Sequence, residues 1–510
     1  MMYMSFSPAL ESSFNDTKLR SDKITPFSGM CSFCTADCPG TCEIGLSAIL
    51  GAAAVYPTNT GNNQIASEKN MPIDYSHFNI NGRVFGAVGA DPKGNSATIF
   101  NVKLGITIGT NNPVSLALPV ILPAIIKLNW KDYFAAAAMA GTICVIGENA
   151  LAKDPKLQYG ADKKISSFPM LNEMLGAFRR YDRGYGQVVL QCNNEDDSAG
   201  LPEYAIKECG ATAIEFKFGQ SAKGTQPANR LKTLEEALKK QEAGTLVHPN
   251  PSLPEVQEAW KQGTSPSFWT YGRLPMWSKE YLTKRIQDLR DMGLKNVYFK
   301  MAGFDREDIE TVLRIAVAAG VDMVTFDGAG GGSGYSPNKM MNEWGLPAVC
   351  IESALLTICS KLETEGLKLP ALALGGGFTS EDQVYKALAI GAPYIKAIGI
   401  CRATMAAAMV GEKTGISLSE GAVPLHLKKY GANKEELFWE LPELRSLYGA
   451  AADEMSTGSI GAYSYIKRIA FGIQHFAALN RKFEVKYIDQ RDVIPLTADA
   501  KSLMKGQWFE

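Results

Sequence analysis

The sequence lacks the features that would indicate a nucleic-acid-binding, secreted or membrane protein. Formal net charge is −1 over 510 residues, so no electrostatic argument favours nucleic acid or an anionic membrane as a partner. The N-terminal stretch MMYMSFSPALESSF has no basic segment followed by an apolar core, and no signal peptide is expected. The most apolar run, residues 114–126, is shorter than the roughly 20 residues of a membrane span, and Pro119 and Pro123 interrupt it. We therefore expect a soluble, cytoplasmic enzyme.

Cysteines are few outside one short run. Of the ten cysteines, six stand alone, mostly in apolar runs where small core residues are expected. The other four form the run Cys31-Ser-Phe-Cys34-Thr-Ala-Asp-Cys38-Pro39-Gly-Thr-Cys42. Four thiolates on so short a loop suit an iron–sulfur cluster, with a four-cysteine zinc site or unligated redox thiols as alternatives. The continuous spacing near a proline favours the cluster, with Cys31, Cys34, Cys38 and Cys42 as its predicted ligands.

Short apolar runs alternate with helical patterns from about residue 113. The runs are residues 116–122, 142–147, 187–192, 213–218, 296–301, 322–327, 371–376 and 394–399. Such alternation predicts a parallel sheet covered on both faces, and eight runs predict a (β/α)8 TIM barrel over residues 113–410.

The predicted barrel has additions at both ends and inside. Residues 1–112 are predicted to hold the cysteine run and a hairpin of Arg83–Ala90 with Ala97–Ile108 around Asp91–Gly94. The stretch at about 219–295 is too long for one crossover and predicts an insertion above the strand ends. Residues 411–510 predict a C-terminal helical extension that serves as a packing or homo-oligomer surface.

The stretch Val321–Gly345 is the strongest sign of a binding site. An apolar strand runs into Asp327 and a turn rich in glycine and hydroxyl side chains. Glycine allows positive φ and close approach of a ligand to the backbone. A flexible surface loop is the alternative. The candidate ligand-binding residues in this turn are Asp327, Gly331, Gly332, Ser333, Gly334, Tyr335 and Ser336.

Polar residues and glycines follow the other predicted strands, where the active site of a barrel lies. Glycine turns after the last two strands, with a helix N-terminus beyond, predict a phosphate site. Its residues are Gly375, Gly376, Gly377, Gly399 and Arg402. Charged and amide side chains follow the earlier strands, namely Glu148, Lys217, Gln220, Lys223 and Lys300.

Each of the charged candidates also has a structural interpretation. Lys300 lies inside an apolar strand, so it either pairs with a core carboxylate or stabilises negative charge on a reduced flavin. Lys217 has the same two interpretations, with a substrate acid as its ligand in place of the flavin. Glu148 is either functional or a helix-capping carboxylate.

These motifs together resemble the FMN-binding domain of glutamate synthases over roughly residues 110–410. Gly331-Gly-Ser-Gly-Tyr-Ser-Pro337 and Gly345-Leu-Pro347 resemble the family's GGTGASP-like loop and GLP. Phe216-Lys-Phe-Gly-Gln-Ser-Ala-Lys223 resembles its IKMAQGAK stretch, which lies beside the 2-oxoglutarate site. Phe299-Lys-Met resembles its flavin-contacting lysine strand, and the turns at Gly375 and Gly399 resemble its phosphate turns.

Three departures from the family are informative. The glutaminase domain with its nucleophilic cysteine is absent, so nitrogen is expected from free ammonia, an amine or a separate subunit. Only Cys401 remains of the three cysteines that bind a [3Fe–4S] cluster, so the run at 31–42 is expected to hold a different cluster, [4Fe–4S]. Gly224-Thr-Gln-Pro replaces an acidic, glycine-rich stretch, which leaves the substrate open.

The resemblance implies a stand-alone FMN and iron–sulfur oxidoreductase of amino-acid biosynthesis. Electrons from a ferredoxin-like donor or partner subunit would reduce FMN, which would deliver hydride for the reductive amination of a 2-oxo acid such as 2-oxoglutarate. Lys217, Lys300, Glu148 and Gln220 are the expected catalytic residues, and Lys217, Lys223, Tyr335 and Ser336 would bind substrate. The alternatives are flavin-dependent oxidation or isomerisation of another small acid, or an electron-transfer subunit of a larger complex.

Overall fold

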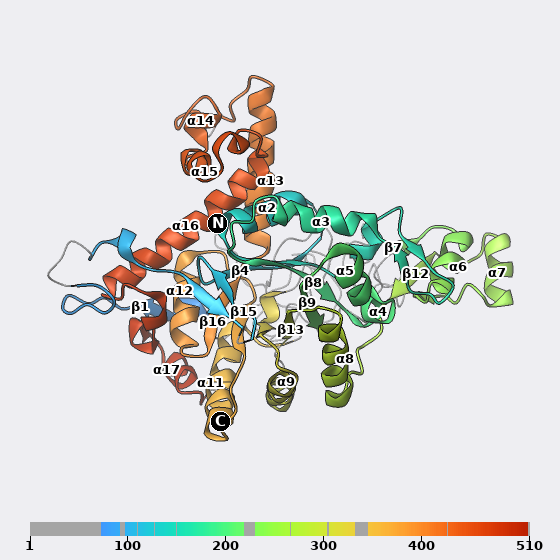
Figure 1. Cartoon of the computed structure of the whole chain (residues 1–510), viewed down its shortest axis with the longest axis horizontal. Coiled ribbons are helices and arrows are strands. Elements are labelled where there is room, and N and C mark those ends of the chain that lie inside the picture. Colours follow the sequence, from blue (N-terminus) through green and yellow to red (C-terminus); the bar gives the residue numbers. More distant parts are fainter. Residues whose placement is uncertain are drawn as a thin grey trace, which may run out of the picture.

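A closed barrel of eight strands, each parallel to its neighbours, is the centre of the fold (Figure 1). The computed structural model describes residues 73–91, 97–109, 111–126, 128–148, 150–218, 230–265, 267–302, 305–331, 345–425 and 427–507. In chain order the barrel strands are β4 (Val120–Ile125), β5 (Ile143–Ile146), β8 (Gln187–Cys192), β9 (Ala213–Lys217), β13 (Asn296–Ala302), β14 (Met323–Asp327), β15 (Ala371–Gly375) and β16 (Ile395–Gly399). The predicted (β/α)8 barrel is confirmed, while its predicted iron–sulfur segment lies outside the described residues.

Helices cover the outside of the barrel. They are α2 (Trp130–Ala140), α3 (Pro169–Arg179), α5 (Leu201–Cys209), α8 (Lys279–Asp291), α9 (Arg306–Ala319), α11 (Ala348–Thr364), α12 (Glu381–Ile390) and α13 (Arg402–Ser419). Helix α9 shows the local logic, because Asp305 caps its first turn and Gly320, at φ 64°, ends it. None of the described helices is long and apolar enough to cross a membrane.

A hairpin closes the bottom of the barrel, but at other residues than predicted. β2 (Ile106–Ile108) pairs antiparallel with β3 (Val114–Leu116), and Ile108 and Leu116 join the apolar cluster of the barrel interior. Residues 83–90 form no strand and contribute only an isolated bridge from Val88 to the C-terminal tail. The first barrel strand is accordingly 120–125, later than the predicted run 116–122, because residues 114–116 belong to this hairpin.

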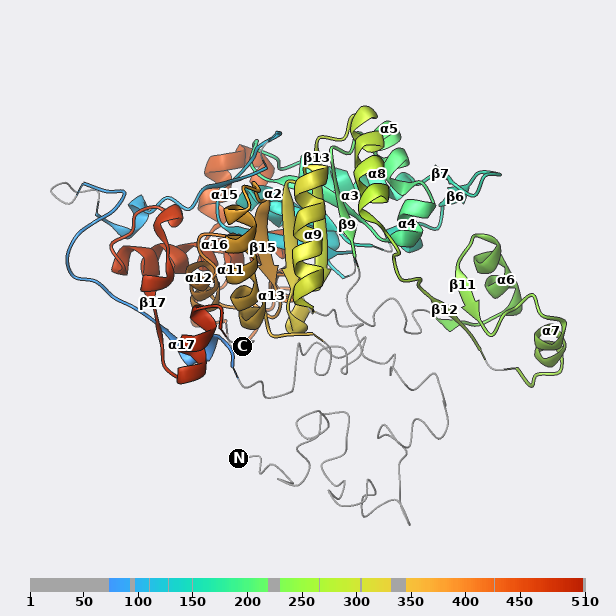
Figure 2. The ribbon, with the colours of Figure 1, turned by 90° about the horizontal axis from the view of Figure 1, so that it is seen from below.

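The insertion between β9 and α8 is a small unit with its own core. Strands β10 (Arg230–Leu231), β12 (Phe268–Tyr271) and β11 (Leu246–His248) form its sheet, which α6 (Leu234–Glu242) and α7 (Pro254–Lys261) accompany. Leu231, Ala237, Val247 and Phe268 are buried together in it. Figure 2 shows this unit projecting from the side of the barrel.

The C-terminal part is helical and packs on the barrel. After α14 (Lys434–Leu437) and α15 (Leu441–Tyr448), the long helix α16 (Thr457–Leu479) lies against α13 (Figure 1). Glycines allow this close contact, because a Cβ on Gly461 would lie 2.8 Å from Ala407 O and 3.0 Å from Gly411 Cα. The chain ends with β17 (Val493–Pro495) and α17 (Ala498–Met504).

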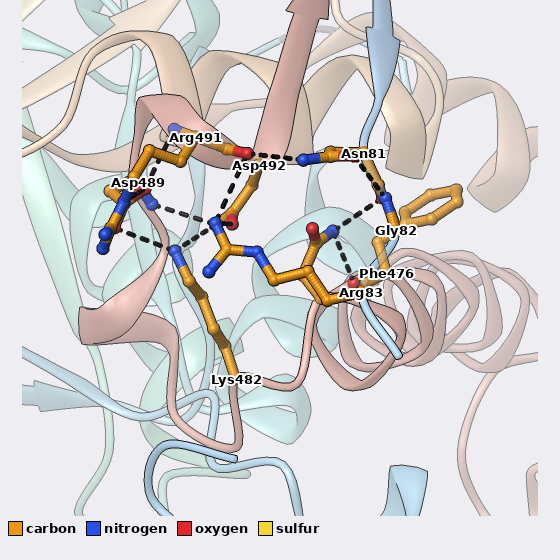
Figure 3. A network of polar contacts seen from close by, with 9 residues as sticks. Asn81, Gly82, Arg83, Phe476, Lys482, Asp489, Arg491 and Asp492 are labelled. Atoms are coloured by element: carbon orange, nitrogen blue, oxygen red, sulfur yellow. Dashed lines mark hydrogen bonds and ion pairs between the residues drawn. The ribbon is translucent and has the colours of Figure 1, made fainter. Parts of the chain in front are cut away.

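A buried polar network joins the tail to the first described residues (Figure 3). β1 (Phe78–Ile80) pairs antiparallel with β17. Lys482, 2% exposed, bonds Asp489 at 2.9 Å and the fully buried Asp492 at 2.7 Å. Arg83 lies 3.6 Å from Asp492 on its other side. We call this set, with the backbone bonds of residues 81–83 to 479–492, the tail network.

Candidate active site

Alternation along the strands points a set of polar side chains into the barrel. Ala213, Tyr298 and Met323 belong to the interior apolar cluster. Successive inward positions on a strand lie two residues apart. The polar residues that face the same interior, nearer the C-terminal ends of their strands, are therefore Glu215 and Lys217 on β9, Lys300 on β13, and Thr325 and Asp327 on β14. We call this end of the barrel the mouth.

Lys300 pairs with Asp327 in the mouth. The ammonium lies 3.0 Å from the carboxylate, and each residue is 4% exposed. Burial alone would lower the pKa of Lys300, but the charges of Asp327 and Glu215 outweigh it and raise that pKa above its usual range. The core-carboxylate interpretation of Lys300 is thus observed, and both residues' role toward a cofactor stays a prediction.

Lys217 pairs with Glu148, and two further polar residues continue this contact inward. The Lys217 ammonium lies 2.5 Å from Glu148 Oε1, with Lys217 5% exposed. The Glu148 backbone N–H points to Gln191 Oε1 at 3.5 Å, and Gln191 Nε2 donates to Glu215 Oε1 at 2.5 Å. Lys217 thus also has a carboxylate partner, as its structural interpretation expects, and its contact with a substrate acid stays a prediction.

Two more carboxyls near the mouth have raised pKa values. Burial raises the pKa of Glu215, although Lys300 and the Gln191 hydrogen bond oppose the shift. Burial also raises the pKa of Asp196, to about 7, and the nearby charge of Glu148 adds to the effect. Asp196 lies on α4 (Asn194–Ser198), where Asn193 caps the helix. With that pKa, the Asp196 carboxyl holds a proton in part of the molecules at neutral pH.

The other side of the mouth is lined by small residues. Ala373 and Ala397 face the barrel interior, and Gly375 and Gly399 follow them two residues on. A Cβ on Gly399 would lie 2.6 Å from Pro123 Cγ, so β16 and β4 approach closely here. We call β15, β16 and β4 the small half of the mouth, and β5, β8, β9, β13 and β14, with the loops that follow them, the charged half.

The small half ends in a glycine turn after β15 and in the N-terminus of α13. Gly376 and Gly377 have φ values of 130° and 87°, which favour glycine. Helix α13 begins at Arg402 without a side-chain cap on its N-cap residue Cys401, while α12 is capped by Ser380. Burial lowers the pKa of the half-buried Arg402, but its guanidinium remains a cation at any physiological pH. A cation and a helix N-terminus together suit an anion.

One buried hydroxyl inside the barrel has no hydrogen-bond partner. Thr325 is 1% exposed, faces inward, and its Oγ1 makes no hydrogen bond. Its neighbours in register are Lys300 on β13 and Ala373 on β15. Buried polar atoms in proteins are normally paired, so this hydroxyl is a candidate contact for a ligand or a water between the two halves.

The structure tests the positions of only part of the predicted site. Described are Glu148, Lys217, Lys300, Asp327, Gly331, Gly375, Gly376, Gly377, Gly399 and Arg402. Gly331 ends a short 3-10 helix, Ala329–Gly331, and a Cβ there would meet Asp327 Cγ at 2.8 Å. Outside the described residues lie Cys31, Cys34, Cys38, Cys42, Gln220, Lys223, Gly332, Ser333, Gly334, Tyr335 and Ser336.

Four polar residues of the site were missed in the sequence, namely Gln191, Asp196, Glu215 and Thr325. Three of them, Gln191, Glu215 and Thr325, lie within runs correctly predicted as strands. Glu215 stands two residues before Lys217, so alternation alone placed it on the same face. Within the part of the chain that the structure covers, no group of three or more His, Cys, Asp or Glu side chains is arranged to hold a metal ion.

Comparison with known proteins adds a family to this geometry. Residues 272–411 match the family described as "Conserved region in glutamate synthase". The archaeal glutamate synthase [NADPH] of Archaeoglobus fulgidus is 26% identical over 229 residues, 44% of this chain and 40% of that protein. The archaeal-type glutamate synthase [NADPH] of Dehalococcoides mccartyi is 31% identical over 118 residues, 23% of each chain. These matches therefore span less than half of the curated relatives' lengths.

The solved structures that resemble this chain are more distant. The flavin-binding domain of baker's yeast flavocytochrome b2 superposes with a TM-score of 0.44 at 13% identity, over 86% of this chain and 80% of that one. A mandelate oxidase gives a TM-score of 0.44 at 14% identity, over 83% and 89%.

The family match covers the part of the chain that holds the last four barrel strands. A closed eight-stranded barrel carries, over residues 272–411, the conserved region of glutamate synthase. Over this region the chain is similar to glutamate synthases.

Proposed function

We propose that this protein is an FMN-dependent oxidoreductase of the glutamate synthase-like kind that acts on a 2-oxo acid. The observation that carries the proposal is the division of the barrel mouth into a small half that ends in glycine turns and a helix N-terminus, and a charged half with two buried lysines. A flat cofactor with a phosphate and an acidic substrate require these two surfaces side by side.

The small half has the features that FMN needs. The turn at Gly376 and Gly377 and the start of α13 at Arg402 would hold the phosphate, since backbone N–H groups and a guanidinium favour an anion. Ala373, Ala397 and Gly399 would leave room for a flat ring over this side of the barrel. Thr325 Oγ1, which has no partner inside the described structure, would meet the ring side of the site.

The charged half would bind and orient the acid. FMN, when bound, supplies hydride transfer. Lys217 would exchange its contact with Glu148 for a carboxylate of the substrate, because a 2-oxo diacid needs cationic partners. Lys300 would place a positive charge beside the cofactor ring, with Asp327 holding the ammonium in position.

Protons for reductive amination would come from the carboxyls of the charged half. Asp196, whose pKa is raised to about 7 by burial and by the charge of Glu148, holds a proton at neutral pH for part of the molecules. Product amines take up protons, and a group of this pKa beside Glu148 and Lys217 can provide them.

The remaining parts of the proposal lie outside the described residues. We propose that Cys31, Cys34, Cys38 and Cys42 ligate a [4Fe–4S] cluster that receives electrons from a ferredoxin-like donor or partner subunit. Gln220, Lys223, Tyr335 and Ser336 are proposed to complete the substrate site. The nitrogen source is proposed to be ammonia, an amine or a second subunit.

Anaerobic purification followed by a visible spectrum and by flavin, iron and sulfide analysis tests this function. The proposal expects bound FMN, or FMN taken up on addition, and iron with sulfide. Reoxidation of the reduced protein by 2-oxoglutarate with ammonia would support reductive amination. Reduction of the flavin by a hydroxy acid instead would support the oxidation alternative. A protein that stays colourless after FMN is added would end the proposal.

A further inference from the structure

Glu215 lies in the layer directly below the two lysines of the mouth. It is 2% exposed and stands between Ala213 and Lys217 on the inner face of β9. Gln191, which is fully buried, donates from Nε2 to Glu215 Oε1 at 2.5 Å. The carboxyl is therefore fixed in place beneath the mouth by a neutral amide, within reach of the charges of Lys300 and Lys217.

The charged and titratable groups around Glu215 come from three strands. Lys217 lies above it on β9, Lys300 and Tyr298 lie on β13, and Asp327 lies on β14. Burial raises the pKa of Glu215, Asp327 adds to the shift, and Lys300 and Lys217 oppose it. Tyr298 stays a neutral phenol, because burial, Asp322 and Glu215 raise its pKa well above the usual value.

The charge of the mouth depends on the carboxyls that carry a proton. Its described cations are Lys217, Lys300 and Arg402, and its described carboxyls are Glu148, Asp196, Glu215 and Asp327. Protonation of Glu215 makes the site one unit more positive directly under the lysines. A buried charge is screened little by solvent, so that unit acts on any anion that enters.

We propose that Glu215 is a positioning residue that takes up a proton when an anion enters the mouth, so that anion binding at this site is linked to proton uptake. The anions are the phosphate of FMN, its ring once it is reduced, and the carboxylates of a 2-oxo acid. This inference rests on the proposed function for the choice of these two anions. Glu215 would let the same lysines bind two negatively charged ligands, because in the empty site its ionised carboxylate offsets part of their buried positive charge.

Linkage fixes the direction of the pH effect. An anion stabilises the protonated form of Glu215, so binding weakens as pH rises through the pKa of this carboxyl. We expect the dissociation constant to rise about tenfold over that titration, as for a pKa that differs by one unit between the free and the bound protein. Glu215→Gln mimics the protonated carboxyl, and its binding should lack this part of the pH dependence.

Calorimetry on the full-length protein tests the inference. FMN and 2-oxoglutarate are each titrated from pH 5.5 to 8.5 in two buffers of different ionisation enthalpy, which reports the protons taken up. The wild type should take up about half a proton more than Glu215→Gln at the pH of largest effect, as a pKa difference of one unit requires. The phosphate of FMN titrates in both proteins alike and cancels in the comparison. Asp196→Asn is the matched control, because it removes a second buried carboxyl near Lys217 and should keep the Glu215 component.

Each outcome decides the inference. Full proton uptake in Glu215→Gln, or loss of uptake in Asp196→Asn alone, overturns it. FMN binding without this linkage overturns the inference and leaves the proposed function standing. If 2-oxoglutarate binds with proton uptake but FMN does not bind, the inference stands and the proposed function is overturned. If neither anion binds, both the inference and the proposed function are overturned. If Glu215→Gln does not fold, Gln191→Leu is the second variant, because it removes the hydrogen bond that favours the ionised carboxylate of Glu215. The midpoint of the pH dependence of anion binding should then lie at higher pH than in the wild type. An unchanged midpoint overturns the inference.

Discussion

The barrel mouth and the tail network both bury lysine–carboxylate pairs, yet their surroundings differ. In the tail network Lys482 meets two carboxylates, and Asp492 also accepts the Asp489 backbone N–H at 3.0 Å. In the mouth Lys300 meets Asp327 beside the unpaired hydroxyl of Thr325 and close to glycine turns. Unpaired polar atoms occur in both places, since Asp492 Oδ1 also has no hydrogen-bond partner among the described residues. The position separates the two: buried charges that tie distant segments together serve the fold, whereas we expect buried charges at the C-terminal ends of barrel strands, beside glycine turns, to serve ligand binding.

The largest expected effect is a loss of stability in Lys482→Met. The change leaves Asp492, which is fully buried, without its closest cation and should lower the free energy of unfolding by about 3–5 kcal/mol. FMN affinity of the protein that remains folded should be unchanged. Denaturant unfolding and flavin titration measure the two effects.

Lys486→Met is the matched control for that variant. Lys486 lies in the same tail, is largely exposed, and pairs with Glu484 at 2.8 Å. Its loss should lower the free energy of unfolding far less than the loss of Lys482, because exposed ion pairs contribute little to stability. A Lys482→Met protein as stable as this control would remove the distinction between the two networks.

Lys300→Met should change flavin binding rather than protein stability. We expect FMN to bind about tenfold to a hundredfold more weakly, or its reduction potential to fall, because a buried cation beside the reduced ring is lost. Flavin fluorescence and a redox titration report this. Lys396→Met, on the same barrel but outward-facing and exposed, is the control and should match wild type. Unchanged affinity and potential in Lys300→Met would make this lysine structural.

Lys217→Met should chiefly raise the KM for the acid. Losing a charge-assisted bond to a carboxylate costs about 1.5–3 kcal/mol, or roughly tenfold to a hundredfold in KM, while FMN content stays at the wild-type level. Steady-state kinetics at several acid concentrations separates KM from kcat. A fall of kcat by the same factor, with KM unchanged, would instead assign Lys217 to the chemical step.

Much of this division was predictable from the sequence, because it depends on strand periodicity. The eight apolar runs predicted the barrel, and the glycine turns and Arg402 follow its last two strands at the expected places. Anion binding by these residues stays a prediction. The hairpin position failed, because residues 114–116 are as apolar as a barrel strand and only tertiary pairing with 106–108 distinguishes them. The partners of Lys300 and Lys217 come from other strands, and only closure of the barrel brings them together.

The smallest expected effect concerns Glu352, a buried carboxyl outside both networks. Its Oε2 accepts from the Tyr75 hydroxyl at 2.9 Å, and its Oε1 has no partner. Burial raises its pKa well above the usual value, so its contribution to stability is full below the unfolded pKa and falls as pH rises. Glu352→Gln should therefore gain about 2–8 °C in Tm relative to wild type between pH 5 and 8. A Tm difference that does not change with pH would contradict this.

Binding of FMN and riboflavin to the purified protein tests the central claim most directly. If the small half holds a phosphate, FMN should bind at least about tenfold more tightly than riboflavin, and Arg402→Met should reduce that preference. Flavin fluorescence quenching measures both dissociation constants under one set of conditions. Equal affinities for the two flavins, or no binding of either, would contradict the account.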